Sequence, residues 1–127
     1  MRKGFGSIMK IKMKARVGWR SIIKRKMTKA DGHYKGGLVA GATVLEMFGD
    51  AATELCVRES GFEGLFRAYD SVDFLAPMYV GDTITAKATI IKVGNTSRQM
   101  QFVAKNQKKV IISKALGTVV IPELKKV

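Results

Sequence analysis

The feature that most constrains the fold is a change in the period of the apolar residues near residue 61. Upstream of this point, apolar residues recur at spacings of three and four, which is typical of one face of a helix that ends near Arg58. These residues are Leu38, Ala42, Leu45, Phe48, Ala52 and Leu55. The pair Ser60-Gly61 then breaks the pattern. The sequence therefore predicts one long amphipathic helix.

Downstream of Gly64 the sequence becomes rich in β-branched and aromatic residues, as expected for strands. Apolar residues alternate with others most clearly over positions 84–90 and 100–104. The predicted strands cover residues 65–77, 82–93, 97–105 and 110–121, and a short strand at 20–28 precedes the helix. This order of one strand, a long helix and four strands predicts an α+β domain with one helix against an antiparallel sheet.

Basic residues are concentrated at the N-terminus. Residues 1–30 carry eleven Lys or Arg and no acid, whereas the rest of the chain carries twelve against ten acids. We therefore predict a basic extension over residues 1–19, followed by a near-neutral domain over 20–127. Such an arm can bind phosphate-rich polymers. Its only aromatic residues, Phe5 and Trp19, lie far apart, so the stacking platform of a single-strand binder is missing and nucleic acid is disfavoured as a partner.

The location of the protein is predicted from what the 127 residues lack. No apolar run reaches the roughly 18 residues needed to cross a bilayer, and the basic N-terminus lacks the apolar core of a secretory signal. A single cysteine, Cys56, excludes an internal disulfide and a cysteine-based metal cluster within one chain. We expect a cytoplasmic protein without a metal site.

A glycine-rich stretch, DGHYKGGLVAGA, lies just before the helix and holds the only histidine of the chain, His33. Glycines permit positive φ and close approach of the backbone to a ligand. The N–H groups where such a loop enters a helix can face an oxygen atom, and the helix dipole favours negative charge there. The alternative is an ordinary helix-entry loop, with Asp31 as a cap and His33 bonded to the backbone.

Four segments carry a resemblance to a known family: HYKGGLVAGA, FGDAATEL, GLFRAYDSVDFLAPMYVGD and KVGNTSRQMQFVA. Together they resemble the 3-aminobutyryl-CoA ammonia-lyases, relatives of β-alanyl-CoA ammonia-lyase and of the hotdog acyl-CoA thioesterases, over roughly residues 24–104. The resemblance implies a hotdog fold, with an antiparallel sheet of about five strands wrapped around one long central helix.

The same resemblance implies an activity and partners. It implies a lyase that reversibly eliminates ammonia from a 3-aminoacyl-CoA, converting 3-aminobutyryl-CoA to crotonyl-CoA by carboxylate-assisted proton abstraction. The substrates would be an acyl-CoA thioester and ammonia, with no cofactor besides the coenzyme A of the substrate. The protein would act as a homo-dimer or higher homo-oligomer.

Candidate catalytic residues follow from the position of carboxylates in related hotdog enzymes. Asp50 is the preferred base, because burial among small neighbours would raise its pKa toward a useful value. Glu54 is the second choice, whereas Glu46 is assigned to a solvated acidic face. Asp31, His33 and Tyr34 would stand around the reacting carbon and handle the protons of the amine.

Candidate binding residues lie in the glycine loop and in the segment GNTSR. N–H groups at Gly36, Gly37 and Gly41 would hold the thioester oxygen, on which enolate character develops during the reaction. The coenzyme A part would be bound by amide, hydroxyl and guanidinium groups. These belong to Asn95, Thr96, Ser97 and Arg98.

Three alternatives stay open at this point. The segment GNTSR also fits a plain polar hairpin turn. A hotdog thioesterase would use the same carboxylate to activate water, and the shared scaffold gives no motif that separates it from a lyase. A non-catalytic acyl-CoA or nucleic-acid binding protein would instead use the basic arm as its main functional part.

Overall fold

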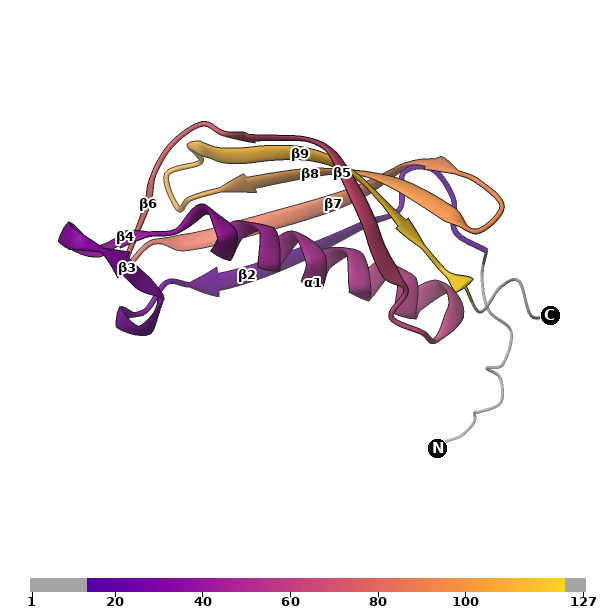
Figure 1. Ribbon diagram of the computed structural model, residues 1–127, viewed down its shortest axis with the longest axis horizontal. Helices are drawn as coiled ribbons and strands as arrows, with labels where there is room; N and C mark the ends of the chain where they lie inside the picture. The colour runs from indigo at the N-terminus through magenta and orange to yellow at the C-terminus, as the bar shows by residue number, and fades with distance from the viewer. Residues whose placement is uncertain (1–13, 123–127) are drawn as a thin grey trace.

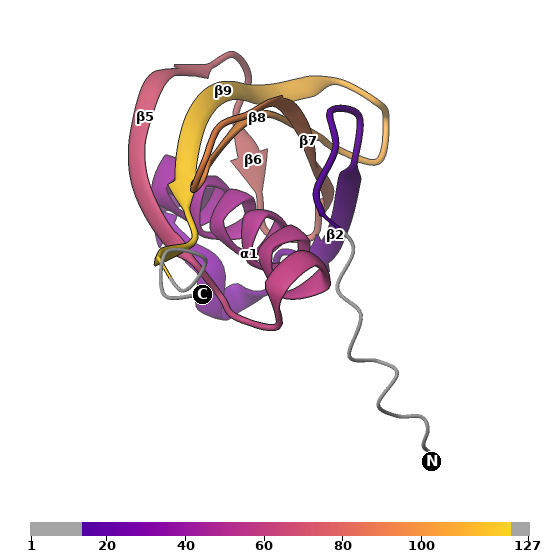
Figure 2. The ribbon, with the colours of Figure 1, turned by 90° about the vertical axis from the view of Figure 1, so that its right-hand side faces the viewer.

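A curved five-stranded antiparallel sheet wraps around one central helix in the computed structural model, which describes residues 14–122 (Figures 1 and 2). The strand order is β2-β7-β8-β9-β5, and every neighbouring pair is antiparallel. The elements are β2 (Arg20–Lys26), α1 (Gly41–Ser60), β5 (Leu65–Phe74), β7 (Thr83–Val93), β8 (Ser97–Lys105) and β9 (Ile111–Val120). The arrangement predicted from the sequence is confirmed.

The start of the helix differs from the prediction, because α1 begins at Gly41 and not at Leu38. Leu38 and Val39 instead form the short strand β4 (Leu38–Val39), which pairs with β6 (Met78–Tyr79) and β3 (Gly32–Tyr34) in a separate three-stranded sheet. Two 3₁₀ turns, η1 (Lys29–Asp31) and η2 (Lys35–Gly37), complete this region. The small sheet holds the glycine loop against the start of the helix.

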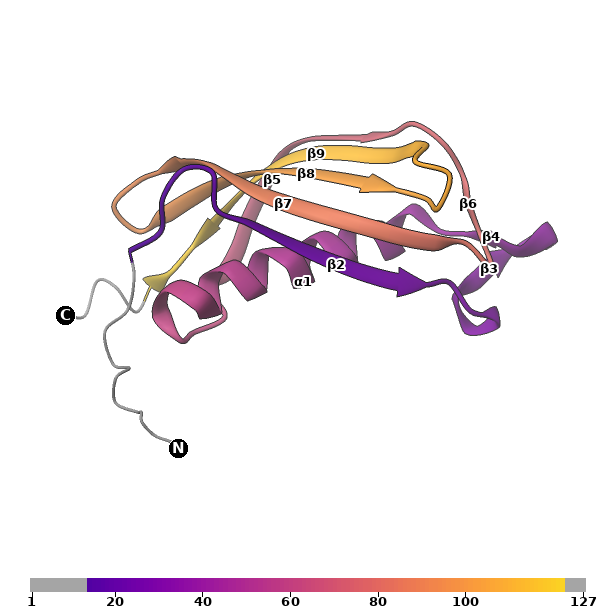
Figure 3. The ribbon, with the colours of Figure 1, turned by 180° about the vertical axis from the view of Figure 1, so that it is seen from behind.

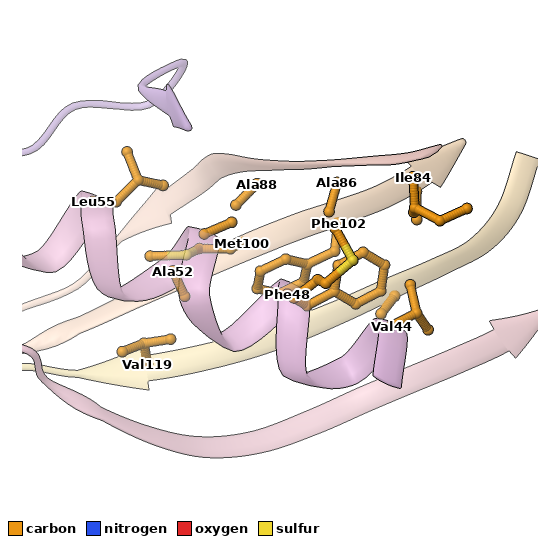
Figure 4. Packing of buried hydrophobic residues seen from close by; sticks show 14 of the residues in the cluster. Val44, Phe48, Ala52, Leu55, Ile84, Ala86, Ala88, Met100, Phe102 and Val119 are labelled. Carbon is orange, nitrogen blue, oxygen red and sulfur yellow. The ribbon is translucent and has the colours of Figure 1, made fainter. Parts of the chain in front are cut away.

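The core lies between α1 and the concave side of the sheet (Figure 4). Val44, Phe48 and Leu55 of the helix are at most 1% exposed, and the ring of Phe48 stacks on Phe102 at a centroid distance of 5.1 Å. The residues predicted to alternate inward are confirmed as core residues. They are Ile84, Ala86, Ala88 and Ile90 of β7 and Met100, Phe102 and Ala104 of β8.

The segment just before β2 is bonded to the domain. The N–H of Gly18 donates to the carbonyl of Ile90, and the N–H of Ile90 donates to the carbonyl of Trp19, both at 2.8 Å. The N–H of Ala15 donates to Oε2 of Glu59 at 3.1 Å. The guanidinium of Arg58 lies 5.5 Å from the centre of the Trp19 ring. Residues 15–19, which the sequence analysis assigned to the extension, thus contact the domain, whereas residues 1–13 lie outside the described residues.

None of the described helices has the length and apolar composition that crossing a bilayer requires.

Candidate active site

A mostly apolar cavity of about 650 Å³ opens beside the first turn of α1. Its wall combines the glycine loop, the helix start and the end of β5, with Tyr34, Gly41, Phe74, Pro77 and Ile112 among the lining residues. A volume of this size lies within the range of small-molecule sites, roughly 300–1,000 Å³. The cavity is therefore the candidate site for an acyl group.

The glycines of the loop have the roles that their conformations require. Gly36 and Gly37 both have a backbone φ of 79°, a value that residues with a side chain rarely adopt. The carbonyl of Gly37 accepts a hydrogen bond of 2.8 Å from the N–H of Val80, which fixes the loop to the start of the next segment. A Cβ on Gly41 would lie 2.7 Å from Cε1 of Phe74, so this glycine lets the cavity wall approach the helix.

The N-terminus of α1 borders the cavity and has no side-chain cap. Its N-cap is Ala40, which has no side-chain oxygen to accept a hydrogen bond. The first N–H groups of a helix have no intrahelical acceptor. Because Ala40, Gly41 and Ala42 line the cavity, these donors and the helix dipole can stabilise a negatively charged oxygen there.

Asp31 lies at the edge of this region as a cap, which was the alternative open from the sequence. Its carboxylate accepts hydrogen bonds from the N–H of Thr28 at 2.7 Å and from Oγ1 of Thr28 at 3.1 Å, and it is ion-paired with Arg25. The backbone bond from Thr28 contributes most to holding its pKa below the usual value. A carboxylate engaged in this way is a poor proton carrier, so its predicted catalytic role is not supported.

His33 and Tyr34 are exposed beside the cavity. Their rings meet edge to face with centroids 4.7 Å apart, and Tyr34 itself lines the cavity. Among the loop residues predicted to handle protons, these two remain accessible to a ligand.

The predicted burial of Asp50 is wrong for the single chain, in which this residue is exposed. It lies nine residues after Gly41, or about 13 Å along the helix axis. Its neighbours on the same stripe are engaged, since Glu54 pairs with Arg58 at 2.5 Å and Glu46 with Arg25 at 3.2 Å.

Glu54 is therefore less suited to act as a base. Partial burial raises the pKa of Glu54, but hydrogen bonds from Arg58 and Ser21 outweigh it and hold the pKa below the usual value. No ion pair of Asp50 is found within residues 14–122. Of the three carboxylates on this stripe, Asp50 thus remains the candidate base.

The GNTSR segment forms the β7–β8 hairpin turn, closed by a 2.8 Å bond from the N–H of Gly94 to the carbonyl of Ser97. Arg98 was predicted to bind coenzyme A, but its side chain is buried, with only 1% of its surface exposed. Its Nε and Nη2 donate to Glu59 at 2.9 and 2.6 Å, and its Nη1 donates to the carbonyls of Gly94 and Ser97 at 3.0 and 2.7 Å. Arg98 thus supports the turn from inside.

The other predicted hairpin residues, Asn95, Thr96 and Ser97, are exposed or half-buried and remain accessible to a ligand. Glu59, the partner of Arg98, was missed by the sequence analysis. Its position four residues after Leu55 places it on the apolar face of the helix. A carboxylate on the apolar face of a helix indicates a buried ion pair, because acidic side chains are almost never fully buried without a partner.

One chain does not bring the two halves of the predicted site together. The glycine loop lies at one end of the elongated domain, beside β3 and β4, and the β7–β8 turn lies at the other end (Figure 1). Within residues 14–122, no group of three or more His, Cys, Asp or Glu is placed to hold a metal ion.

Comparisons with known proteins place this architecture among enzymes of acyl-CoA thioesters. A family model described as the thioesterase superfamily matches residues 36–112. The 3-aminobutyryl-CoA ammonia lyase of Acetoanaerobium sticklandii is 41% identical over 120 residues, which cover 82% of this chain and 95% of the relative. The β-alanyl-CoA:ammonia lyase of Clostridium propionicum superposes with a TM-score of 0.79 and 32% identity, covering 84% of this chain and 87% of that one.

A hydrolase is also among the relatives. An uncharacterized acyl-CoA thioester hydrolase of Zymomonas mobilis is 35% identical over 74 residues, which cover 58% of this chain and 46% of that protein. The match to lyases thus extends over more of the chain than the match to this hydrolase.

Proposed function

The chain belongs to the thioesterase superfamily, and we propose that within it the protein is a carbon–nitrogen lyase that reversibly removes ammonia from a 3-aminoacyl-CoA. The product is the corresponding enoyl-CoA, with 3-aminobutyryl-CoA and crotonyl-CoA as the expected pair. The observation that carries the proposal is the 41% identity to a 3-aminobutyryl-CoA ammonia lyase over almost its whole length. The apolar cavity at the uncapped helix start supports it.

The proposed reaction begins at the carbon next to the thioester. A carboxylate, Asp50 in this proposal, takes a proton from that carbon, and the electron pair left behind moves onto the thioester oxygen. N–H groups at the start of α1 donate to that oxygen as its charge grows. The pair then forms the carbon–carbon double bond while the carbon–nitrogen bond breaks, and the ammonium group leaves as ammonia.

The proton held by the base passes to ammonia, which departs as ammonium, and in the reverse reaction the same base takes that proton back. A second group near the amine can relay the proton between the base and ammonia. Asp31 and Glu54 are engaged by Arg25 and Arg58. His33 and Tyr34, exposed at the cavity, are therefore the residues that we propose for this role.

We propose that the complete site forms between two copies of the chain. The strand β5 is an edge of the sheet, and large apolar side chains along and just after it are exposed, Leu65 by 61%, Phe74 by 55% and Leu75 by 56%. Antiparallel pairing of two β5 strands would bury these side chains and satisfy both edges. Because such pairing reverses one copy, the glycine loop of one protomer would lie at the same end as the β7–β8 turn of its partner.

Complementation between two inactive variants tests this shared site. We expect His33→Ala to damage the loop half and Asn95→Ala to damage the turn half, each with a large loss of turnover. Mixing the two under conditions that exchange subunits should restore about a quarter of the wild-type activity, since half of the dimers are mixed and half of their sites are intact. An absence of recovery despite demonstrated exchange would place the whole site within one chain.

Thioester hydrolysis is the alternative function, and the match to the Zymomonas hydrolase is the observation that favours it. In that case Asp50 would activate water, and the free thiol of coenzyme A would be released without any need for ammonium. The lyase leaves the thioester intact, so release of thiol separates the two functions.

A further inference from the structure

Six cationic side chains gather on the outer face of the sheet, which we define as the side of β2, β7, β8 and β9 opposite α1. The alternation that buries Ile84, Ala86, Ala88 and Ile90 against the helix directs the intervening residues of β7 outward. The same alternation acts in the neighbouring strands, which Figure 3 shows from their outer side. The cations are Arg20, Lys24, Lys26, Lys87, Lys105 and Lys114.

The register of the sheet brings these cations together from distant parts of the sequence. Lys87 is paired with Ile22 on one side and Val103 on the other, and Val103 is paired with Lys114. One row across four strands therefore alternates aliphatic and basic residues. A hollow of about 350 Å³ lies here, with Lys87, Lys105 and Lys114 among its lining residues.

The acids nearest this charge lie on the edge strand β5, where Asp73 is paired with Lys114 and Asp70 accepts a hydrogen bond of 3.2 Å from Gln99. The strands β2, β7, β8 and β9 contain no aspartate or glutamate. The ion pairs of the described residues use Arg25, Arg58 and Arg98, and none of the six cations of the outer face. Six cations against these two edge carboxylates leave the surface with a net positive charge, which is complementary to a polyanion and opposes stacking of one outer face on another.

We propose that the outer face binds the phosphate backbone of a single-stranded nucleic acid. The sheet curves around α1, so this face is convex (Figure 2). Duplex DNA is stiff over about 150 base pairs and would touch a convex surface at few points, whereas a flexible strand can follow it. Residues 1–19, which precede β2 in the sequence, contain six cations and no acid.

The chemistry of the face predicts binding without sequence preference. The only aromatic residue in the four strands is Phe102, which is buried against the helix, so the face lacks a stacking platform just as the N-terminal arm does, and binding would rest on phosphate contacts alone. Phosphate contacts by lysine are independent of sequence and strongly dependent on salt. The cavity at the helix start lies on the other side of the sheet, so both ligands can bind at once.

The test measures anisotropy of a labelled oligothymidine of about 20 nucleotides against salt concentration, with the full chain. The double variant Lys87→Gln with Lys114→Gln removes two phosphate contacts. The slope of log K against log salt should become less steep by about 1.4, and the affinity near 0.1 M salt should fall roughly 25-fold. Lys29→Gln with Lys109→Gln removes the same charge away from the outer face and should have a much smaller effect. Turnover and far-UV circular dichroism should match the wild type in both variants.

Three results would overturn the proposal. Equal weakening by the two double variants would show that net charge alone attracts the strand. An unchanged slope in the Lys87 and Lys114 variant would place binding elsewhere, for example on residues 1–19. Displacement of the oligonucleotide by vesicles of anionic lipid, added at equal phosphate concentration, would likewise assign the face to a membrane surface.

Discussion

Replacing Glu59 with glutamine should lower the free energy of unfolding by about 3–5 kcal/mol, because it leaves a buried charge without its counter-ion. Glu59 is 4% exposed and Arg98 is 1% exposed. The carboxylate accepts two hydrogen bonds from Arg98, at 2.9 and 2.6 Å, and one from the N–H of Ala15, at 3.1 Å. Glutamine keeps the size of the side chain but removes its charge.

The expected loss is large against the total stability of a domain, which is typically about 5–15 kcal/mol. Urea unfolding followed by far-UV circular dichroism at neutral pH measures it directly. Glu54→Gln is the matched control on the same helix. Its pair with Arg58 has side chains 46% and 40% exposed, so its removal should cost less than about 1 kcal/mol.

The dependence on pH gives a second readout. Burial raises the pKa of Glu59, but the bonds from Arg98 and Ala15 outweigh it and hold the pKa below its ordinary value of 4.5. A depressed pKa contributes stability above the unfolded value, and this contribution is lost as the pH falls. The difference between wild type and Glu59→Gln should therefore be constant near neutral pH and shrink in acid. A cost below about 1 kcal/mol would refute the argument.

Three further predictions concern the site and the ends of the chain. Asp50→Asn should lower kcat by about 10²–10⁴-fold, while Glu46→Gln stays near wild type; full activity of the Asp50 variant would remove it as the base. Burial raises the pKa of Cys56 to about 11, so a thiol reagent should label only the unfolded chain, and rapid labelling of the native protein would contradict this. Deleting residues 1–13 should leave steady-state kinetics unchanged, because the described contacts to the domain begin at Ala15; lost turnover would show otherwise.

The large elements of the fold were predictable because their signals are local. The change from helical to strand periodicity near Gly61 reports directly which side chains are buried, and α1, β7 and β8 follow it closely. The predicted start of the helix was wrong, because Leu38 and Val39 are apolar as residues of the short strand β4 and not of the helix. They pair with a strand some forty residues away, and no local pattern records such a partner.

The roles of single polar residues depend on tertiary contacts that the sequence does not show. Asp31 fits a proton-handling role and Arg98 a coenzyme A-binding role by type and position, yet Asp31 is held by Thr28 and Arg25, and Arg98 by Glu59. The expected burial of Asp50 fails in a single chain because no described element covers that side of the helix. In the assembly proposed above, a second copy would be available to cover it.

The measurement that tests the central claim most directly is the reaction of crotonyl-CoA with the protein, with and without ammonium. Enoyl absorbance and free thiol are followed in the same sample. We predict that absorbance falls only when ammonium is present and that no thiol of coenzyme A is released, because addition of ammonia consumes the double bond and leaves the thioester intact. Release of thiol at a rate independent of ammonium would contradict the lyase assignment and identify the protein as a thioesterase.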